Sequence, residues 1–288
     1  MLKPELTADG SYTFFSEEIG EYFHSTQGAK EEALLKFAKP CQLAQKALQP
    51  IVRILDVCYG LGYNTAAALE VIWENNPDCF VELVALELDP TVPRSAIAQD
   101  LLSSWKQPIP QLLRLLAQSL QIHNHQFQAV LHLGDARATI QQLQQSSFQA
   151  DVIFLDPFSP PRCPQLWTIE FISRLASCCQ ANGRLVTYSC AAAVRTALLA
   201  AGFKIGETEA VGNRQPGTIC SPSATDLPPL PTKALEHLQT RAAIPYRDPQ
   251  LCDPAAVILQ RRQLEQQASS LEPTSRWKKR WLNKPLID

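Results

Sequence analysis

Apolar runs alternate with amphipathic segments through the middle of the chain, and this alternation predicts an α/β fold. The first run, Ile51–Val57, is followed by a glycine-containing turn and an Ala-rich segment, which indicates a strand, a turn and a helix. Further apolar runs predict strands over residues 81–87, 129–133, 151–155, 183–189, 203–210 and 217–221. Helical patterns cover 64–74, with Asn64 as the expected cap, 167–179 and 191–201. The alternation favours a Rossmann-like, mostly parallel seven-stranded sheet with helices on both faces.

The flanking segments differ in composition from this central part. Residues 1–50 form a polar lead dotted with aromatic residues, and residues 91–122 form a Leu- and Gln-rich stretch that we expect to be a helical insertion. From residue 221 the chain is rich in proline, which is typical of a linker or an extended wrap. An amphipathic helix is expected over 254–268. We therefore expect an N-terminal cap at 1–50, a central domain at 51–220 and a C-terminal extension at 221–288.

Acidic residues follow the ends of four predicted strands. They are Asp56, Glu87, Asp135 and Asp156. Ligands of parallel sheets bind at the carboxyl ends of the strands, and acids buried there need partners, so the set predicts a polar, cationic ligand. Glu87 is placed to accept hydrogen bonds from a ribose diol, Asp135 suits an adenine amine, and Asp56 suits a sulfonium or an ammonium group. Each acid taken alone is equally consistent with a helix cap or a surface ion pair.

The turn after the first strand contains Gly60 and Gly62, which allow a sharp bend and close approach to a ligand. Thr65 occupies the third glycine position of a dinucleotide-binding fingerprint, which argues against that class. The spacing, with Asp56 four residues before Gly60, resembles motif I of S-adenosylmethionine (SAM) methyltransferases. Cys58 stands where those enzymes usually have a further glycine. The alternative is an ordinary turn between a strand and a helix.

The sequence Asp156-Pro157-Phe158 carries the candidate chemistry. Methyl transfer to an amine is an in-line displacement that needs a neutral nitrogen with its lone pair aimed at the methyl group. The Asp156 carboxylate and a backbone carbonyl could accept the two N–H bonds and fix that direction, while Phe158 stacks on a planar base. The segment resembles the D-P-P-[FY] element of amino-group methyltransferases. The alternative is a strand end followed by a proline turn.

A longer resemblance extends this motif. The run FLDPFSPPRCPQLW at 154–167 is similar to FLDGFAPxxNPxMW in the methyltransferase half of the bacterial tRNA 5-methylaminomethyl-2-thiouridine biosynthesis bifunctional protein family, MnmC. The segments TADGSYTFFSEEIGEYFHS at 7–25 and DVCYGLGYN at 56–64 are also similar to that family. The resemblance covers roughly residues 7–220. This chain departs from the family at Pro157, which replaces a glycine, and at Cys163, which replaces an asparagine. We expect this protein to lack the FAD-dependent oxidase half.

The resemblance implies a SAM-dependent transferase that converts the aminomethyl group of the tRNA wobble uridine to methylaminomethyl, with or without a 2-thio group. It implies that SAM is bound by the Gly60–Gly62 turn, Glu87, Asp135 and the strand end at Asp156, and we expect Asp56 and Asn64 to belong to the same cofactor site. Basic and aromatic side chains are the expected tRNA contacts, because arginine and lysine bind phosphates and tryptophan stacks on unpaired bases. They are Arg162, Trp167, Arg214, Arg276, Lys278, Lys279 and Arg280, beside Trp277 and Trp281. The basic tail is also consistent with a solvated chain end. Tyr22 and His24 either line the pocket or pack beneath the N-terminal segment.

Composition narrows the classes of function that remain open for this protein. The 288 residues carry a net charge of -2, which does not indicate nucleic-acid binding by bulk charge. None of the nine cysteines forms a C-x-x-C pair, which argues against zinc and favours reduced thiols in a cytoplasmic protein. We expect no signal peptide and no membrane span. Two other functions remain open. The protein could be a small-molecule methyltransferase or aminopropyltransferase that works without RNA, or a non-catalytic binding module. The sequence also leaves the oligomeric state open.

Overall fold

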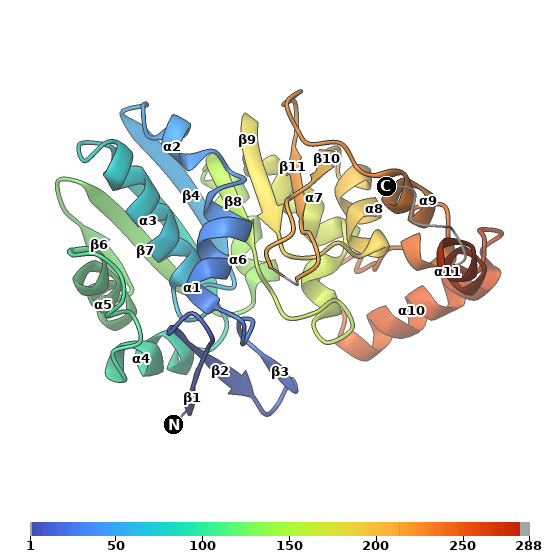
Figure 1. The fold of residues 1–288 in the computed structure, drawn as a ribbon, viewed down its shortest axis with the longest axis horizontal. Helices are drawn as coiled ribbons and strands as arrows, with labels where there is room; N and C mark the ends of the chain where they lie inside the picture. Colours follow the sequence, from blue (N-terminus) through green and yellow to red (C-terminus); the bar gives the residue numbers. More distant parts are fainter. Residues whose placement is uncertain (1, 213, 283–288) are drawn as a thin grey trace.

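The computed structural model describes residues 2–212 and 214–282, and a mostly parallel eight-stranded sheet forms its centre (Figure 1). The strand order is β10-β11-β9-β8-β4-β5-β7-β6. The bounds are β4 (Ile51–Val57), β5 (Phe80–Glu87), β6 (Gln121–His123), β7 (Phe127–Leu133), β8 (Ala150–Leu155), β9 (Cys179–Thr187), β10 (Lys204–Glu207) and β11 (Thr218–Ser221). The strands β7, β5, β4, β8 and β9 run parallel, whereas β6, β11 and β10 pair antiparallel.

The predicted seven-stranded sheet was wrong by one strand. The short edge strand β6 lies at the end of the segment that we expected to be wholly helical. It has only three residues, and its pairing with β7 is what makes it a strand. A run this short carries too little periodicity to be recognised from sequence.

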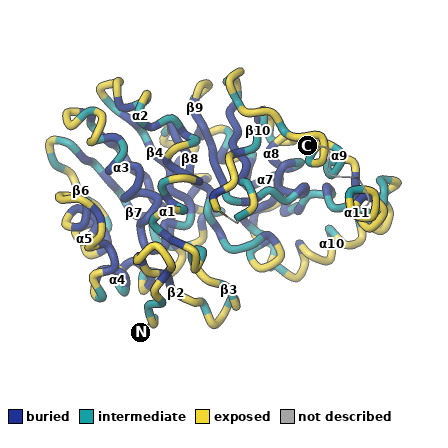
Figure 2. Tube along the Cα trace, viewed as in Figure 1, coloured by how far each residue is buried: buried dark blue, intermediate teal, exposed yellow. Residues whose placement is uncertain are grey.

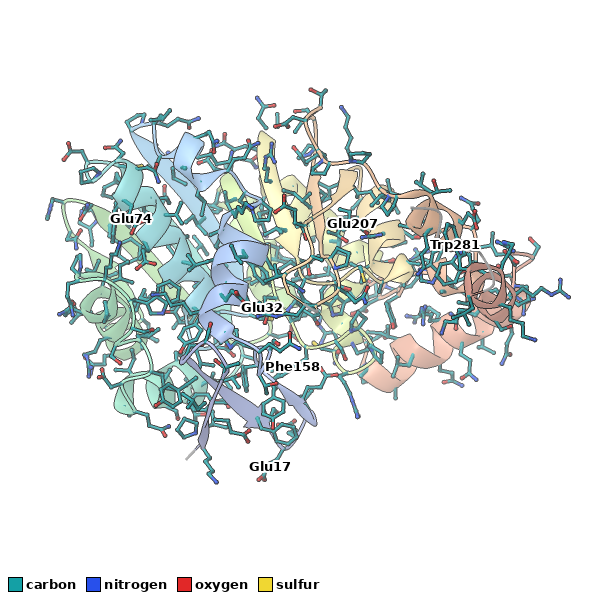
Figure 3. All side chains as sticks on the ribbon, viewed as in Figure 1. Glu17, Glu32, Glu74, Phe158, Glu207 and Trp281 are labelled. Atoms are coloured by element: carbon teal, nitrogen blue, oxygen red, sulfur yellow. The ribbon has the colours of Figure 1, made fainter. Side chains whose placement is uncertain are left out.

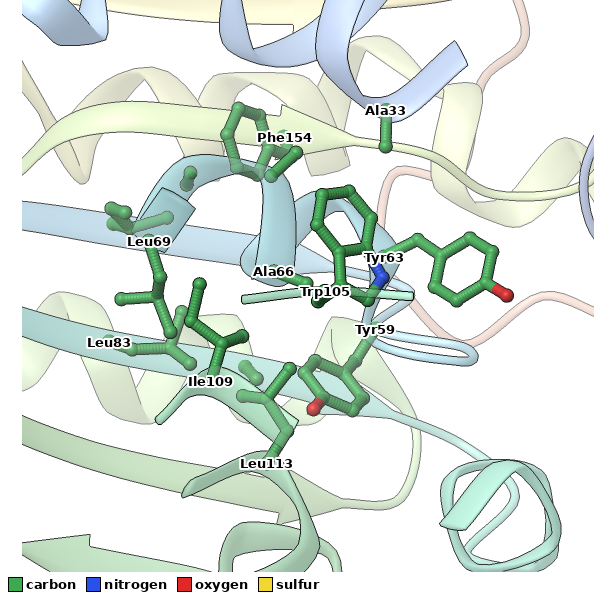
Figure 4. Packing of buried hydrophobic residues seen from close by; sticks show 14 of the residues in the cluster. Ala33, Tyr59, Tyr63, Ala66, Leu69, Leu83, Trp105, Ile109, Leu113 and Phe154 are labelled. Atoms are coloured by element: carbon green, nitrogen blue, oxygen red, sulfur yellow. The ribbon is translucent and has the colours of Figure 1, made fainter. Parts of the chain in front are cut away.

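Alternation along the strands divides the hydrophobic core between the two faces of the sheet. In β4, Ile54 belongs to one buried cluster and Leu55 to the other, and in β8 Phe154 and Leu155 divide in the same way. Successive side chains of a strand point to opposite faces, so near-continuous apolar runs build both clusters. Figure 4 shows the first cluster, in which Phe154, Leu69 and Leu83 pack between the sheet and α3.

The helices cover both faces of the sheet. Their bounds are α3 (Tyr63–Asn75), α4 (Thr91–Ala98), α5 (Ile109–Ser119), α6 (Ala136–Gln145), η2 (Pro164–Trp167), α7 (Ile169–Ser177) and α8 (Ala192–Ala200). The residue capping α3 is Gly62, so the prediction that Asn64 caps this helix is wrong. Thr168 caps α7 instead of lying inside the predicted 167–179 helix, because its hydroxyl accepts from the Phe171 amide.

The N-terminal cap (residues 2–50) combines a small antiparallel sheet with short helices. It contains β1 (Pro4–Leu6), β2 (Tyr12–Ser16), β3 (Glu21–Tyr22), α1 (Ala29–Glu32), the π-helical η1 (Ala33–Ala38) and α2 (Leu43–Lys46). Phe14 and Phe37 are buried in the same cluster as the sheet residues, and the Phe37 ring lies 6.0 Å from that of Phe154. The N-terminal cap therefore shares its core with the sheet and lies over the end of β8.

The C-terminal extension (residues 222–282) folds against α6, α7 and α8. It contains α9 (Thr232–His237), η3 (Arg241–Ala243), α10 (Ala255–Ala268) and α11 (Thr274–Leu282). Tyr246, Leu251 and Ile258 are buried in the second core cluster, so this segment is more than a linker. Figure 2 shows the buried strands at the centre and the exposed outer surface of α10 and α11.

Candidate active site

The turn between β4 and α3 has the left-handed backbone that its sequence requires. Gly60 and Gly62 have φ values of 57° and 86°, and Cys58, which replaces the usual glycine, has a φ of 68°. A Cβ on Gly62 would lie 2.5 Å from the Tyr59 hydroxyl oxygen, so the close approach there is to a neighbouring side chain. The turn therefore keeps the left-handed backbone of a glycine-rich motif at Cys58 as well. A residue with a Cβ adopts this conformation only at a cost in free energy.

Asp56 lies beneath this turn and is fully buried. Its Oδ2 accepts a hydrogen bond from the Thr65 hydroxyl at 2.6 Å, whereas Oδ1 has no partner among the described residues. Burial, with a smaller contribution from the Glu87 charge, raises the pKa of Asp56 to about 7. This geometry favours support of the turn over the direct contact with a cationic group that the sequence indicated.

Glu87 ends β5 and fastens the turn from the side. Its Oε2 accepts from the Gly60 amide at 2.8 Å, and Oε1 accepts from the Asp89 amide at 2.9 Å. Burial raises the pKa of Glu87, against the lowering effect of these amides. A carboxylate has about four acceptor positions, so each oxygen keeps capacity for a ligand hydroxyl.

Asp135 is the most exposed of the four acids, and Arg137 holds it. Asp135 caps α6 through the Arg137 amide, and its Oδ2 lies 2.7 Å from Arg137 Nη2. Arg137 Nη1 in turn donates to Asp248 of the C-terminal extension at 2.8 Å. Asp248 is fully buried, so the extension helps to fix the position of a strand-end acid.

Asp156 ends β8 and faces the start of α3. Its Oδ2 accepts a hydrogen bond from Asn64 Nδ2 at 2.8 Å, and Asn64 Oδ1 is buried without a partner among the described residues. Burial and then the Glu32 charge raise the pKa of Asp156 well above the usual aspartate range. The structure thus joins Asp156 with Asn64 across two strand ends.

Side chains from three other elements hold the Asp156 loop (residues 156–163). The Tyr188 hydroxyl donates to the Pro157 carbonyl at 2.9 Å, and Trp167 Nε1 donates to the Phe158 carbonyl at 2.9 Å. Glu21 of β3 accepts hydrogen bonds from the Ser159 amide, at 2.9 Å, and from its hydroxyl. These bonds fix the backbone on either side of Phe158.

The N-terminal cap closes over the glycine turn. The Phe23 and Phe158 rings make an edge contact with centroids 5.0 Å apart, and a Cβ on Gly60 would lie 3.7 Å from Phe23. Phe23 therefore lies between the two motifs that the sequence singled out. His24 packs on Tyr63 with ring centroids 5.1 Å apart, and burial lowers its pKa to about 4.

Some of the predicted tRNA contacts are exposed, whereas others are buried and bound to neighbouring residues of the protein. Arg162 is exposed beside the N-terminal cap, close to Gly20. Trp167 is fully buried, so its predicted contact with substrate is wrong, and its role is to hold the Asp156 loop. Arg214 is also mostly buried and lies 2.9 Å from Glu31, which argues against phosphate binding.

The basic tail is helical over its described part, and its tryptophans are structural. Trp277 is buried and stacks on His237 with ring centroids 4.2 Å apart, and Trp281 donates to Glu236. Arg280 pairs with Glu272 and Glu236, whereas three of its neighbours on α11 are exposed: Arg276, Lys278 and Lys279. Residues 283 and 284, also in the predicted tail, lie outside the described residues.

Four residues near the site were missed by sequence reasoning: Glu21, Phe23, Lys36 and Tyr188. Tyr188 follows β9 directly, so extending the strand-end argument to the fifth parallel strand would have found it. Lys36 interrupts the apolar run ALLKFA and is almost fully buried, which was a readable signal. Glu21 and Phe23 act through long-range contacts that no local pattern indicates.

Comparison with known proteins defines the class of this site. The family model for S-adenosyl-L-methionine-dependent methyltransferases matches residues 94–222. The crystal structure of MnmC2 from Aquifex aeolicus superimposes with a TM-score of 0.82 at 33% identity, covering 93% of this chain and 86% of that one. The bifunctional protein MnmC of Acidovorax sp. (strain JS42) is 32% identical over 216 residues, which are 69% of this chain.

An uncharacterized protein of Methanocaldococcus jannaschii is 32% identical over 247 residues, which are 84% of this chain and 66% of that protein. The chain spans about a third of the length of the bifunctional relatives that it matches, since the aligned part is 32% of the Acidovorax protein. The fold is that of a SAM-dependent methyltransferase. The chain belongs to the MnmC methyltransferase family, which includes MnmC2 and the methyltransferase half of MnmC.

The residues present fit SAM. The Glu87 carboxylate, the left-handed glycine turn and Asn64 Oδ1, which has no partner among the described residues, form a polar edge suited to a ligand with a ribose. Within residues 2–212 and 214–282, no cluster of three or more His, Cys, Asp or Glu side chains could hold a metal ion. No helix in the same ranges is long and apolar enough to cross a membrane.

We predict that SAM and S-adenosylhomocysteine bind in calorimetric titrations and that NAD does not. Replacing Glu87 with Ala should weaken SAM binding by about 1–3 kcal/mol, the usual loss for hydrogen bonds to a charged group. Glu87→Gln keeps one acceptor oxygen and should lose less. Glu82→Gln, at the other end of β5, serves as the control and should leave affinity unchanged. Tight NAD binding without heat from SAM would contradict the assignment.

Proposed function

We propose that this protein transfers a methyl group from SAM to the aminomethyl group of the wobble uridine in tRNA. The product is 5-methylaminomethyluridine or its 2-thio form. The observation that carries the proposal is the placement of Asp156, anchored by Asn64 in a loop that three side chains hold. The similarity to MnmC, a tRNA 5-methylaminomethyl-2-thiouridine biosynthesis protein, supports the same substrate class. A tRNA substrate also implies a cytoplasmic location.

The cofactor would be held by the strand-end acids. We assign the ribose hydroxyls to Glu87 and the adenine amine to Asp135, whose exposed carboxylate keeps acceptor capacity beside Arg137. The Gly60–Gly62 turn would face the methionine portion, with Asp56 supporting it from below. When bound, SAM supplies the methyl group on a sulfonium that is an excellent leaving group.

The chain's own residues would orient the amine. Asp156 accepts one N–H bond, which points the nitrogen lone pair in a fixed direction, and Asn64 holds the carboxylate in place. The Pro157 carbonyl keeps a second lone pair beside its bond from Tyr188, so it can accept the other N–H. The Phe158 ring can stack on the uracil, while Phe23 shields the space between the ring and the glycine turn from water.

The remaining contacts to tRNA would come from exposed cations. Arg162 lies in the Asp156 loop, and three basic residues of α11 lie on the C-terminal extension: Arg276, Lys278 and Lys279. Phosphate contacts of this kind position an RNA without reading its sequence. The identity of the base would then come from the pocket around Asp156 and Phe158.

Replacing Asp156 with Ala should reduce kcat by roughly 10²-fold or more, because the amine loses the group that positions it. Asp156→Asn keeps an acceptor oxygen and should lose less. The measurement is single-turnover methylation of tRNA that carries 5-aminomethyluridine, from about pH 6 to about pH 9. The affinity for SAM should change little in either variant.

The matched control is Asp78→Ala, which removes an exposed carboxylate just before β5, at the amino end of the strand and away from the site. It should leave methylation at the wild-type rate. A wild-type kcat in Asp156→Ala would show that Asp156 only ends the strand, and the catalytic assignment would then be wrong.

Neutralising Lys278 and Lys279 together should raise the KM for tRNA and leave SAM affinity unchanged. Each lost phosphate contact should flatten the dependence of log affinity on log salt concentration by about 0.7–0.9. The control is Lys106→Gln, an exposed lysine on the opposite side of the molecule that pairs with Glu74. Equal tRNA kinetics of the double variant and the control at several salt concentrations would mean that α11 does not contact tRNA.

A further inference from the structure

A cluster of largely buried charges lies where the N-terminal cap meets the β10–β11 connection, near the end of β8. We call Glu32, Lys36 and Arg214 the cap charge cluster. Lys36 is 4% exposed, and its Nζ donates to the Gln215 carbonyl at 2.9 Å. Glu32 Oε1 lies 3.9 Å from Lys36 Nζ and 3.8 Å from Arg214 Nη1. Figure 3 shows Glu32 and Phe158 in the central part of the molecule, where the N-terminal cap meets the sheet.

The packing of η1 against β8 places Lys36 near the end of that strand. Lys36 lies in the π-helical turn η1, and the next residue, Phe37, packs against Phe154 of β8. Phe154 precedes Asp156 by two residues, so the same packing brings η1 to the end of β8. Single π-helical turns occur frequently at functional sites. Burying a lysine costs free energy unless partners hold it, and nothing in the hydrophobic packing requires a charge there.

Charged groups from several elements act on Lys36. They are Glu32 on its own helix, Arg214 of the β10–β11 connection, Cys190 after β9, and Asp156. Burial and the Arg214 charge lower the pKa of Lys36, and the other three raise it. Burial and then the Glu32 charge raise the pKa of Asp156, whereas the Lys36 charge lowers it. The cluster therefore acts electrostatically on the group to which we assign the substrate amine.

The charges around Asp156 affect whether the bound substrate amine is protonated. An ammonium group has no lone pair, so only the neutral amine can accept a methyl group. Two carboxylates, those of Glu32 and Asp156, would favour the ammonium form, whereas a nearby cation favours the neutral amine. We propose that Lys36 is a positioning residue that offsets these carboxylates, so that the bound amine is neutral while Asp156 accepts its hydrogen bond. The inference rests on the proposed function.

The steps balance without a further reactant. The substrate ammonium first releases one proton to solvent and becomes the neutral amine. The nitrogen lone pair then forms the new N–C bond as the C–S bond to the methyl group breaks, and the electron pair of that bond stays on sulfur. The products are S-adenosylhomocysteine and a protonated methylaminomethyl group. Lys36 takes no part in bond making, and its charge acts only on the first equilibrium.

The test is the pH profile of single-turnover methylation at saturating SAM and saturating aminomethyl-tRNA, which reports ionisations in the bound complex. Lys36→Met should move the midpoint of the acid limb up by about one pH unit, because the bound amine loses a neighbouring cation. Glu32→Gln should move it down, because it removes one of the two carboxylates that favour the ammonium form. Lys36→Arg keeps the charge and should keep the midpoint. Lys39→Met removes an exposed lysine of the same segment, paired with Glu209, and should also keep it.

Opposite shifts in Lys36→Met and Glu32→Gln separate an electrostatic role from structural damage, which would lower the rate at every pH. If Lys36→Met does not fold, as judged by SAM calorimetry, Lys36→Gln is measured in its place and should show the same upward shift. A midpoint equal to wild type in the neutral variant at position 36, or a downward shift there, would overturn the role of Lys36. Failure of the wild-type protein to methylate aminomethyl-tRNA would instead refute the proposed function.

Discussion

The site depends on one constraint: parallel strands deliver acidic side chains to a common edge, where burying them costs free energy unless they find hydrogen-bond donors. Three of these acids have such a donor. Thr65 donates to Asp56, the Gly60 and Asp89 amides donate to Glu87, and Asn64 donates to Asp156. These same bonds shape the glycine turn and orient the start of α3. Satisfying the acids therefore builds the site, which explains why two distant motifs meet there.

The two terminal segments complete this edge of the sheet in different ways. The N-terminal cap supplies Glu21 and Phe23, which hold and cover the Asp156 loop, and it brings the buried charge of Lys36 to the same place. The C-terminal extension acts from the other side through Asp248 and Arg137. Both segments share a hydrophobic core with the sheet, so neither is an independent appendage.

Sequence patterns predicted the strands of the central domain and the acids at their ends, because burial on both faces leaves near-continuous apolar runs. They failed where the answer depends on long-range contacts. Trp167 was read as a substrate contact, but packing against Tyr188 buries it, and Arg214 finds its partner on α1, far away in sequence. The sequence predicts Asn64 as a helix cap and a cofactor contact, because the local order of residues does not show that Asp156 lies opposite. The edge strand β6 is too short to show a period.

The most direct test of the central claim is mass analysis of nucleosides after incubating the protein and SAM with tRNA that carries 5-aminomethyluridine. We expect conversion to 5-methylaminomethyluridine. The same tRNA transcribed without modification should not be methylated, since that tRNA lacks the amine. Equal methylation of unmodified tRNA, or turnover of the free nucleoside as efficient as that of tRNA, would contradict the central claim.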